Sequence, residues 1–248
     1  MREEEYRLLS NFEKKYWWHV GRRKIIKNLI EGFLNQHQNL EILDVGCGTG
    51  GNYNLLKKYG EVKGIDASKT AIDLCKKNNF TNVVLGDCRN TGFDDSCFDL
   101  IIALDLLEHL EDEVGVLKEF KRILKAKGNI IVTVPAYKFI WSKHDENLHH
   151  KRRYLLKEIV SSLENNGFKV IKSSYIITFL APIIVFIRLL ENLLSHFFTL
   201  TKKNSYIILP EVINDFFIKI LYFEAWLIKY VNFPFGISIV CIGQKKDE

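Results

Sequence analysis

A glycine-rich segment, Asp44–Gly51 (DVGCGTGG), has the composition of a loop that holds a nucleotide-like cofactor against the main chain. Its Gly46, Gly48 and Gly51 satisfy the spacing G-x-G-x-x-G, and Asp66 follows about 20 residues later, as dinucleotide-binding units require. Glycines lack a Cβ and therefore let a ligand approach the backbone closely. The spacing by itself is compatible with a dinucleotide and with S-adenosylmethionine.

The charge of Asp44 separates these two cofactors. A dinucleotide would bring a pyrophosphate to this loop and to the N-terminus of the following helix, and the Asp44 carboxylate would repel it. S-adenosylmethionine has no phosphate and brings an ammonium group, which a carboxylate binds. Asp66 could accept hydrogen bonds from both ribose hydroxyls. We therefore predict S-adenosylmethionine, with a NAD-type oxidoreductase as the alternative.

A polar and aromatic segment, Trp141–Tyr154, is predicted to be a loop with a chemical role. Methyl transfer to a hydroxyl requires removal of a proton, for which histidine is suited near neutral pH. Either His149 or His150 could be this base, while Arg152 and Arg153 could bind a carboxylate, phosphate or pyrophosphate on the acceptor. The predicted catalytic residues are His149, His150, Arg152, Arg153 and Tyr154.

Short apolar runs alternate with helical segments through the first half of the chain. The predicted strands are Leu40–Val45, Glu61–Ile65, Asn82–Leu85, Phe98–Ala103 and Asn129–Val134. The predicted helices between them are Asn52–Lys58, Ser68–Asn78 with Ser68 as N-cap, and Glu111–Leu124. This alternation indicates a parallel sheet with right-handed crossovers, whose ligands bind at the carboxyl ends of the strands.

The second half adds a helix at Leu155–Asn165 and a strand at Phe168–Ser173, which we expect to pair antiparallel with a last strand at Ile237–Ile242. An apolar helical insertion, 176–232, lies between these strands. It could be a lid over a hydrophobic acceptor, a helix pair in the membrane interface, a dimer face or additional core. Its flanking lysines favour an interfacial or lipid-binding role: Lys202, Lys203, Lys219 and Lys229. Its longest uncharged run is shorter than the ~20 residues that cross a bilayer.

The composition, 47% apolar and 26% charged residues, excludes a disordered chain, a collagen-like repeat and a small disulfide scaffold. A net charge of +5 is too small to indicate nucleic-acid binding. The five cysteines include no C-x-x-C pair, so neither zinc nor a disulfide framework is indicated. With its acidic N-terminus, the chain is predicted to be one cytoplasmic domain with an N-terminal helical cap, 1–38, and peripheral contact with the inner membrane face.

Five spaced motifs resemble those of class I S-adenosylmethionine-dependent methyltransferases of types 11 and 12. They are Ile42–Gly50, Gly64–Ser68, Gly86–Cys88, Phe98–Ala103 followed by Leu107–Leu110, and Leu124–Gly128, which departs from L-K-P-G-G at Ala126 and Asn129. The resemblance covers residues from about 16 to 168. It implies an α/β fold with a Rossmann-like, seven-stranded, mostly parallel sheet whose last strand is antiparallel.

The same resemblance implies a set of cofactor-binding residues. Asp87 would bind the exocyclic amine of adenine, and Arg22 or Arg23, in an N-terminal aromatic segment, would bind the cofactor carboxylate. The full predicted set is Arg22, Asp44, Gly46, Cys47, Gly48, Gly50, Asp66, Ala67, Asp87, Cys88, Leu104 and His109.

On the acceptor side, the segment His150–Tyr154 matches an H-x-R-R-Y pattern of methyltransferases of glycan and lipid pathways. Asp105, Glu108 and His109 resemble a metal-associated segment of ubiquinone O-methyltransferases, but Leu-Glu-His is also common in this superfamily without metal, so no metal is assigned. We predict O-methylation of a hydrophobic or lipid-linked acceptor, such as a polyprenyl-linked glycan or a quinone. A membrane-associated protein that binds the cofactor without catalysis is a further alternative.

Overall fold

The computed structural model describes residues 3–34, 38–195 and 209–247. Its centre is a seven-stranded sheet with the order β3-β2-β1-β4-β5-β7-β6. The strands are β1 (Leu40–Val45), β2 (Gly60–Asp66), β3 (Val83–Leu85), β4 (Phe98–Leu104), β5 (Leu124–Pro135), β6 (Phe168–Ile176) and β7 (Ser238–Lys245). The predicted strands are all present, with bounds that differ by a few residues.

Neighbouring strands from β3 to β5 are parallel, whereas β7 runs antiparallel to both β5 and β6. The predicted sheet with its antiparallel last strand is therefore confirmed. The central strands are almost continuously apolar because helices cover both faces of the sheet. Leu43, Leu100 and Ile101 are fully buried. The parallel register brings the carboxyl ends of β1, β2 and β4 to one edge.

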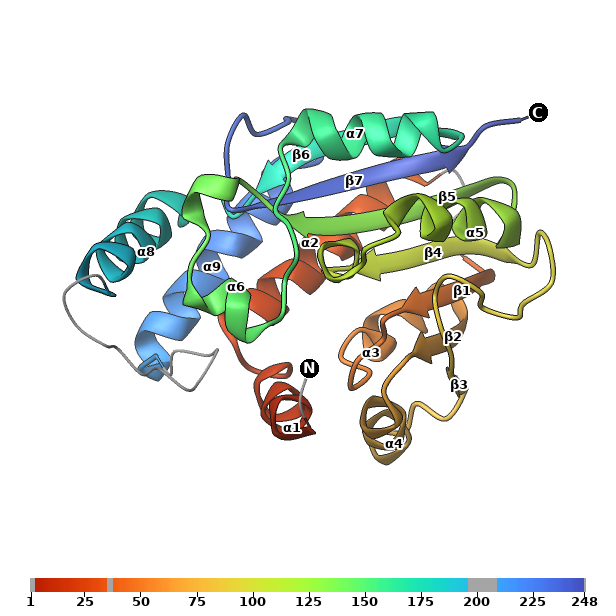
Figure 1. Cartoon of the computed structure of the whole chain (residues 1–248), viewed down its shortest axis with the longest axis horizontal. Helices are drawn as coiled ribbons and strands as arrows, with labels where there is room; N and C mark the ends of the chain where they lie inside the picture. Colours follow the sequence, from red (N-terminus) through yellow and green to blue (C-terminus); the bar gives the residue numbers. More distant parts are fainter. Residues whose placement is uncertain (1–2, 35–37, 196–208, 248) are drawn as a thin grey trace.

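Helices cover the sheet on both sides (Figure 1). They are α1 (Glu3–Phe12), α2 (Trp17–Phe33), α3 (Tyr53–Leu56), α4 (Lys69–Lys77), α5 (Glu113–Ile123), α6 (Lys143–Asn147), α7 (Leu156–Asn165), α8 (Ala181–Ser195) and α9 (Glu211–Leu227), with 3₁₀ turns η1 (Leu107–His109) and η2 (Lys138–Ile140). The predicted N-cap of α4 is confirmed, since the side chain of Ser68 accepts a hydrogen bond from the N–H of Ala71.

The segment between β5 and α7 is more ordered than the predicted loop, because it contains η2 and α6. Ser142 precedes α6, and its N–H donates to the Asp145 carboxylate at 3.0 Å. This contact satisfies a backbone donor at the start of the helix. A Ser-x-x-Asp capping signal therefore forms a single helical turn inside a polar segment.

The apolar insertion contains α8 and α9. Helix α9 packs along α2, where Leu221 lies against Gly21 so closely that a Cβ on the glycine would collide with it. Hydrogen bonds join the same two helices, one from Trp17 N–H to Asn214 Oδ1 and one from Asn28 Nδ2 to the Ala225 carbonyl. Figure 1 shows α2 and α9 side by side behind the sheet. The insertion is thus tied to the N-terminal helical cap.

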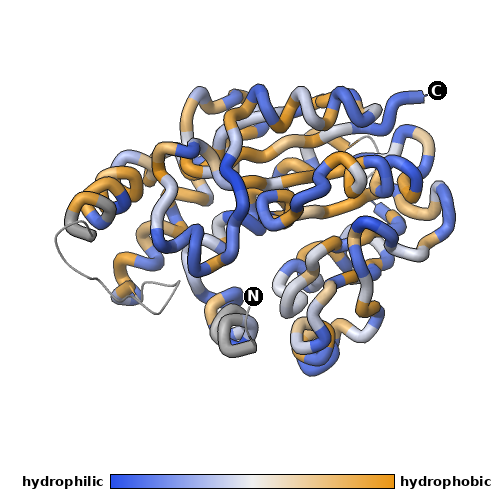
Figure 2. The backbone as a smooth tube through the Cα atoms, in the orientation of Figure 1, coloured by the Kyte–Doolittle hydropathy of each residue, from blue (hydrophilic) through white to orange (hydrophobic). Residues whose placement is uncertain are grey.

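The outer side of the insertion is apolar and exposed. Figure 2 shows α8 as one of the most hydrophobic parts of the backbone trace. Large exposed side chains on α8 include Ile183, Phe186, Leu189, Leu190 and Leu193, and on α9 they include Val212, Phe216, Phe223 and Trp226. Across the described residues, none of the helices combines the length and the hydropathy that a bilayer span needs. The predicted contribution of Lys202 and Lys203 lies outside the described residues.

Candidate active site

A cavity of ≈1090 Å³ lies at the carboxyl ends of β1, β2 and β4 and continues to α6 and α8. Ten of the twelve predicted cofactor residues line it: Arg22, Gly46, Cys47, Gly48, Asp66, Ala67, Asp87, Cys88, Leu104 and His109. His149, His150 and Arg153 of the predicted catalytic set line the same cavity. Asp44 and Gly50 do not line it, although both belong to the same β1–loop segment.

The glycine loop is held by its own backbone and by Asp66. The N–H groups of Gly46 and Cys47 both donate to the Ile65 carbonyl, at 2.8 and 3.2 Å. Gly46 has a φ of +68°, a conformation that costs glycine little, and a Cβ there would lie 3.0 Å from Leu106. These contacts fix a tight turn whose main chain faces the cavity.

Asp66 occupies the end of β2, as predicted. Its Oδ1 accepts from the Ser68 N–H at 2.8 Å and its Oδ2 from the Gly48 N–H at 3.0 Å. Burial raises the pKa of Asp66, while the two backbone hydrogen bonds oppose that rise. Each oxygen has further lone-pair capacity, so the side chain can also accept hydrogen bonds from a ligand.

Asp44 is 1% exposed, and its Oδ2 has no hydrogen-bond partner among the described residues. Burial raises the pKa of Asp44 to about 7, although the nearby charge of Arg22 lowers it. A buried carboxylate oxygen without a donor is energetically unfavourable. In the part of the chain that the structure describes, Asp44 Oδ2 therefore lacks a hydrogen-bonding donor or cation that would stabilise its charge.

The N-terminal helices close one side of the cavity through residues that sequence reasoning did not find. Thr49 Oγ1 donates to the carboxylate of Glu13, a buried cavity residue between α1 and α2. A Cβ on Gly51 would lie 2.5 Å from the same carboxyl group. Burial raises the pKa of Glu13, and the hydrogen bond from Thr49 opposes this. Glu13 lies outside the matched motifs, so the sequence carried no signal for it.

Arg22 lies in the cavity wall, where it pairs with Asp105. Its Nε is buried and has no hydrogen-bond partner among the described residues. Asp87, predicted to bind adenine, is exposed and holds Arg89 through both carboxylate oxygens. The hydrogen bonds from Arg89 lower the pKa of Asp87. An adenine amine would therefore compete with Arg89 for Asp87.

At the other end of the cavity, Asp145 orients His150. The Nδ1 atom of His150 lies 2.9 Å from Asp145 Oδ1, and its Nε2 lies 3.9 Å from Glu108 Oε1. Burial would raise the pKa of Asp145, but the hydrogen bond from His150 and the charge of Arg153 hold it below its usual range. The ionised Asp145 can thus fix the orientation of the His150 ring. His149, by contrast, is exposed and has a φ of +58°.

The predicted roles of Arg152 and Tyr154 in contacting a substrate do not fit their positions, because neither residue lines the cavity. Arg152 Nη2 donates to the Leu110 carbonyl at 2.9 Å. Tyr154 is buried and donates from its hydroxyl to Glu113 Oε2 at 2.8 Å. Both side chains hold the segment after α6 against the start of α5. Sequence spacing places the H-x-R-R-Y residues together but cannot show that successive side chains point in different directions.

Glu108, His109 and His150 bring three potential metal-ligand atoms within 4.8 Å of one another. Asp105, the first residue of the metal-like segment, is instead engaged by Arg22 and by Thr133 Oγ1. Burial raises the pKa of Glu108 well above its usual value and lowers that of His109 to about 4. The free site therefore favours a neutral carboxyl group beside a neutral imidazole.

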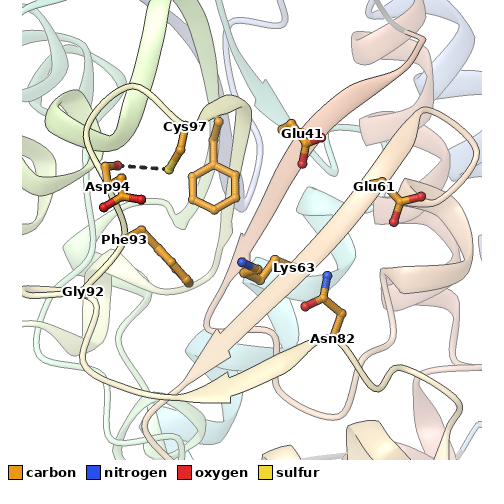
Figure 3. Close-up of a pocket in the computed structure, with 9 residues that line it drawn as sticks. Glu41, Glu61, Lys63, Asn82, Gly92, Phe93, Asp94 and Cys97 are labelled. Atoms are coloured by element: carbon orange, nitrogen blue, oxygen red, sulfur yellow. Dashed lines mark hydrogen bonds between the residues drawn. The ribbon is translucent and has the colours of Figure 1, made fainter.

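A smaller hollow of ≈220 Å³ lies near the amino ends of β1, β2 and β4 (Figure 3). Lys63 Nζ lies 5.0 Å from the centre of the Phe93 ring, and Cys97 Sγ donates to the Asp94 carbonyl at 3.0 Å. None of the predicted site residues lines this hollow. The site therefore lies at the opposite end of the strands.

Comparison with known proteins agrees with this geometry. Residues 43–132 match the family model described as a methyltransferase domain. This match extends from within β1 to within β5 and includes the glycine loop and Asp66. The chain carries a class I methyltransferase domain. The predicted resemblance is confirmed, and the cofactor of the domain is S-adenosylmethionine rather than a nicotinamide dinucleotide.

Relatives of the methyltransferase domain include proteins of Methanocaldococcus jannaschii and Staphylococcus aureus. An uncharacterized protein of Methanocaldococcus jannaschii is 30% identical over 60% of this chain and 63% of its own length. Demethylmenaquinone methyltransferase of Staphylococcus aureus is 28% identical over 57% of this chain and 66% of its own length. The chain thus spans less than two thirds of each of these relatives.

The fold also matches a solved structure of phosphoethanolamine N-methyltransferase 2 from Haemonchus contortus in complex with S-adenosyl-L-methionine. The TM-score is 0.59 at 17% identity, over 90% of this chain and 52% of that one. The site of the methyltransferase domain fits the cofactor independently of this likeness. Asp66 lines the cavity and can accept hydrogen bonds from the ribose hydroxyls. The unpartnered Oδ2 of Asp44 has the charge that suits the ammonium group, and Asp44 belongs to the segment that leads into the glycine loop although it does not itself line the cavity.

Proposed function

We propose that the protein transfers a methyl group from S-adenosylmethionine to an oxygen atom of a hydrophobic or lipid-linked acceptor, with His150 as general base. A polyprenyl-linked glycan or a quinone-like compound would have this character. The observation that carries the proposal is the single cavity that joins the glycine loop and Asp66 to His150 and α8.

The cofactor-binding end comprises the glycine loop, Asp44, Asp66 and Arg22. Bound S-adenosylmethionine supplies an electrophilic methyl group. The domain contributes backbone positioning through Gly46–Gly48, acceptors for hydroxyl groups at Asp66 and a guanidinium at Arg22 for the cofactor carboxylate. Holding two reactants in a fixed relative position accounts for a large part of the acceleration of such reactions.

His150 is the better placed of the two candidate bases. Asp145 holds its Nδ1, which leaves Nε2 toward the cavity wall formed by Glu108 and His109. An imidazole oriented by a carboxylate can accept a proton from an acceptor hydroxyl through its other nitrogen. His149 has no comparable carboxylate contact among the described residues, and its side chain is exposed.

Helix α8 supports a hydrophobic acceptor. Ile184 and Ile187 line the cavity, while Phe186 on the outer side is 67% exposed. One helix thus connects the site with an apolar surface, as expected for an enzyme that receives its acceptor from a lipid bilayer. Demethylmenaquinone methyltransferase of Staphylococcus aureus, whose name specifies a quinone, is among the relatives. We place the protein in the cytoplasm, in peripheral contact with the inner membrane face.

The test is transfer of labelled methyl groups from S-adenosylmethionine to a polyprenyl-phosphate-linked sugar, a polyprenylated quinol and a free sugar. We expect label on one of the lipid-linked compounds and none on the free sugar. His150→Ala should lower kcat about 100-fold or more without changing cofactor affinity. His149→Ala is the matched control and should change kcat less than about threefold. A larger loss for His149→Ala would contradict the assigned base.

A further inference from the structure

The cavity wall formed by α6 and α8 contains two buried guanidinium groups but one buried carboxylate that pairs with them. Asp145 is fully buried, and Arg153 and Arg188 have side chains that are 2% and 15% exposed. Arg153 contacts one oxygen of this carboxylate, with Nε and Nη2 each 2.8 Å from Asp145 Oδ1, and His150 Nδ1 contacts the same oxygen. The other oxygen, Oδ2, accepts a hydrogen bond from the Ser142 N–H at 3.0 Å. The carboxylate oxygens of Asp145 therefore already accept hydrogen bonds from residues other than Arg188.

Arg188 is correspondingly poorly paired. Its Nη1 lies 3.9 Å from Asp145 Oδ2 and has no hydrogen-bond partner among the described residues. Burial and the charge of Arg153 lower the pKa of Arg188 to about 10, so the guanidinium remains charged at neutral pH. Glu191, half-buried on the next turn, opposes this shift less than Asp145 does. The neighbouring His144 is neutral, because burial and Arg188 lower its pKa to about 4.

An incompletely paired buried cation is unfavourable unless a ligand completes it. Arg188 lines the cavity together with Ile184 and Ile187 from the same helix, so a ligand there meets a charge beside an apolar wall. Arg152 and Arg153, the arginines that the sequence indicated for anion binding, are occupied by protein partners. Of Arg152, Arg153 and Arg188, the described residues leave a buried guanidinium nitrogen without a hydrogen bond at Arg188, which belongs to the apolar insertion.

We infer that Arg188 binds an oxyanion, the phosphate or carboxylate head of an amphiphilic acceptor, inside the cavity. This inference rests on the proposed function and specifies the acceptor: its apolar part lies along Ile184 and Ile187 and its anionic head contacts Arg188. A guanidinium can hold such a group through two parallel hydrogen bonds. The residue thereby selects acceptors by charge, while His150 carries the chemistry.

The experiment is calorimetric titration of the full chain with dodecyl phosphate below its micellar concentration, dodecyl maltoside and inorganic phosphate. The wild type should bind dodecyl phosphate more tightly than dodecyl maltoside, and inorganic phosphate most weakly. Arg188→Met should weaken dodecyl phosphate binding about tenfold or more and leave dodecyl maltoside binding unchanged. Lys76→Met, an exposed charge on α4 outside the cavity, is the matched control and should change neither.

Thermal unfolding separates ligand binding from a structural role. Without ligand, Arg188→Met should raise Tm by about 2 °C or more, because it removes a buried charge that repels Arg153. A fall in Tm together with unchanged dodecyl phosphate binding would show that Arg188 only supports Asp145 and would overturn the inference. Arg188→Lys, which keeps the charge, should retain binding within about threefold.

Parallel titration with S-adenosylmethionine distinguishes the two proposals. If the wild type binds S-adenosylmethionine but Arg188→Met binds dodecyl phosphate like the wild type, only the oxyanion site is wrong. If the wild type binds no S-adenosylmethionine, the proposed function fails. Equal binding of inorganic phosphate and dodecyl phosphate would show a site for free anions and overturn the amphiphilic acceptor.

Discussion

The two ends of the cavity differ in the buried atoms that they leave without a hydrogen bond. Among the described residues these include Asp44 Oδ2 and Arg22 Nε near the cofactor end, and Arg188 Nη1 and Glu108 Oε2 near the acceptor end. The surroundings also differ. Asp66 is held by backbone N–H groups of Gly48 and Ser68, whereas Arg188 depends on a carboxylate already shared with Arg153 and His150.

This difference shows how the two ends are specialised. Backbone donors hold the cofactor end in shape before any ligand binds, and its vacant carboxylate oxygen suits a cation. The acceptor end is held by side-chain ion pairs between distant segments, and its vacant donor suits an anion. Unpaired atoms of both signs near the cofactor end match the ammonium and carboxylate groups of the cofactor, and the unpaired guanidinium nitrogen at the acceptor end matches an anion.

The largest expected effect is at Asp66. Asp66→Ala removes two acceptors for ligand hydroxyls and the anchor of Gly48, and should weaken S-adenosylmethionine binding about 100-fold. Calorimetric titration measures this, with S-adenosylhomocysteine and NAD as companion ligands. Asp73→Ala, an exposed acid on α4, is the control and should bind like the wild type. Unchanged binding in Asp66→Ala would contradict the assigned cofactor end.

A smaller effect should come from the titration of Asp44. Its pKa is about 7 because burial disfavours the charge, and an ammonium group binds the ionised form. Ionisation of Asp44 increases as pH rises toward 7, so affinity for S-adenosylmethionine should rise about tenfold from pH 5.5 to pH 7. Asp44→Asn should bind weakly with little pH dependence. Affinity that falls over this range would show that Asp44 does not contact the ammonium group.

The smallest effect concerns the exposed surface of α8. Phe186→Ser should reduce binding to phosphatidylglycerol vesicles about fivefold, because one large apolar side chain no longer inserts. Co-sedimentation measures the bound fraction. Val114→Ser, which removes an exposed apolar side chain from α5, should bind like the wild type. Equal losses in both variants would argue against membrane contact through α8.

The fold could be predicted closely because its signals are local. Apolar strands, the N-cap at Ser68 and the glycine turn each depend on residues near one another in sequence, and parallel topology then brings the carboxyl ends together. The main local error was the segment 141–154, where one capping interaction produces α6. Ten of the predicted cofactor residues and three of the predicted catalytic residues line the cavity. Arg152 and Tyr154 instead bind Leu110 and Glu113 outside it.

The residues that sequence reasoning missed share one property: their partners are far along the chain. Glu13 contacts Thr49 and Gly51, and Arg188 lies against Asp145 on α6. A lone arginine within an apolar helical stretch was a weak signal for Arg188. It could not indicate whether the charge faces solvent or a cavity.

By itself the sequence determined the family, the succession of strands and helices along the chain and the position of the cofactor loop, because these follow from local composition and spacing. Only the tertiary structure decided which histidine has a carboxylate partner, which arginines are already neutralised and which remains available. Hydrogen bonds and ion pairs act over a few ångströms, whereas the sequence separates Arg188 from Asp145 by several elements. The pairing of charges, and hence the chemistry of the acceptor end, emerges when α6 and α8 pack together.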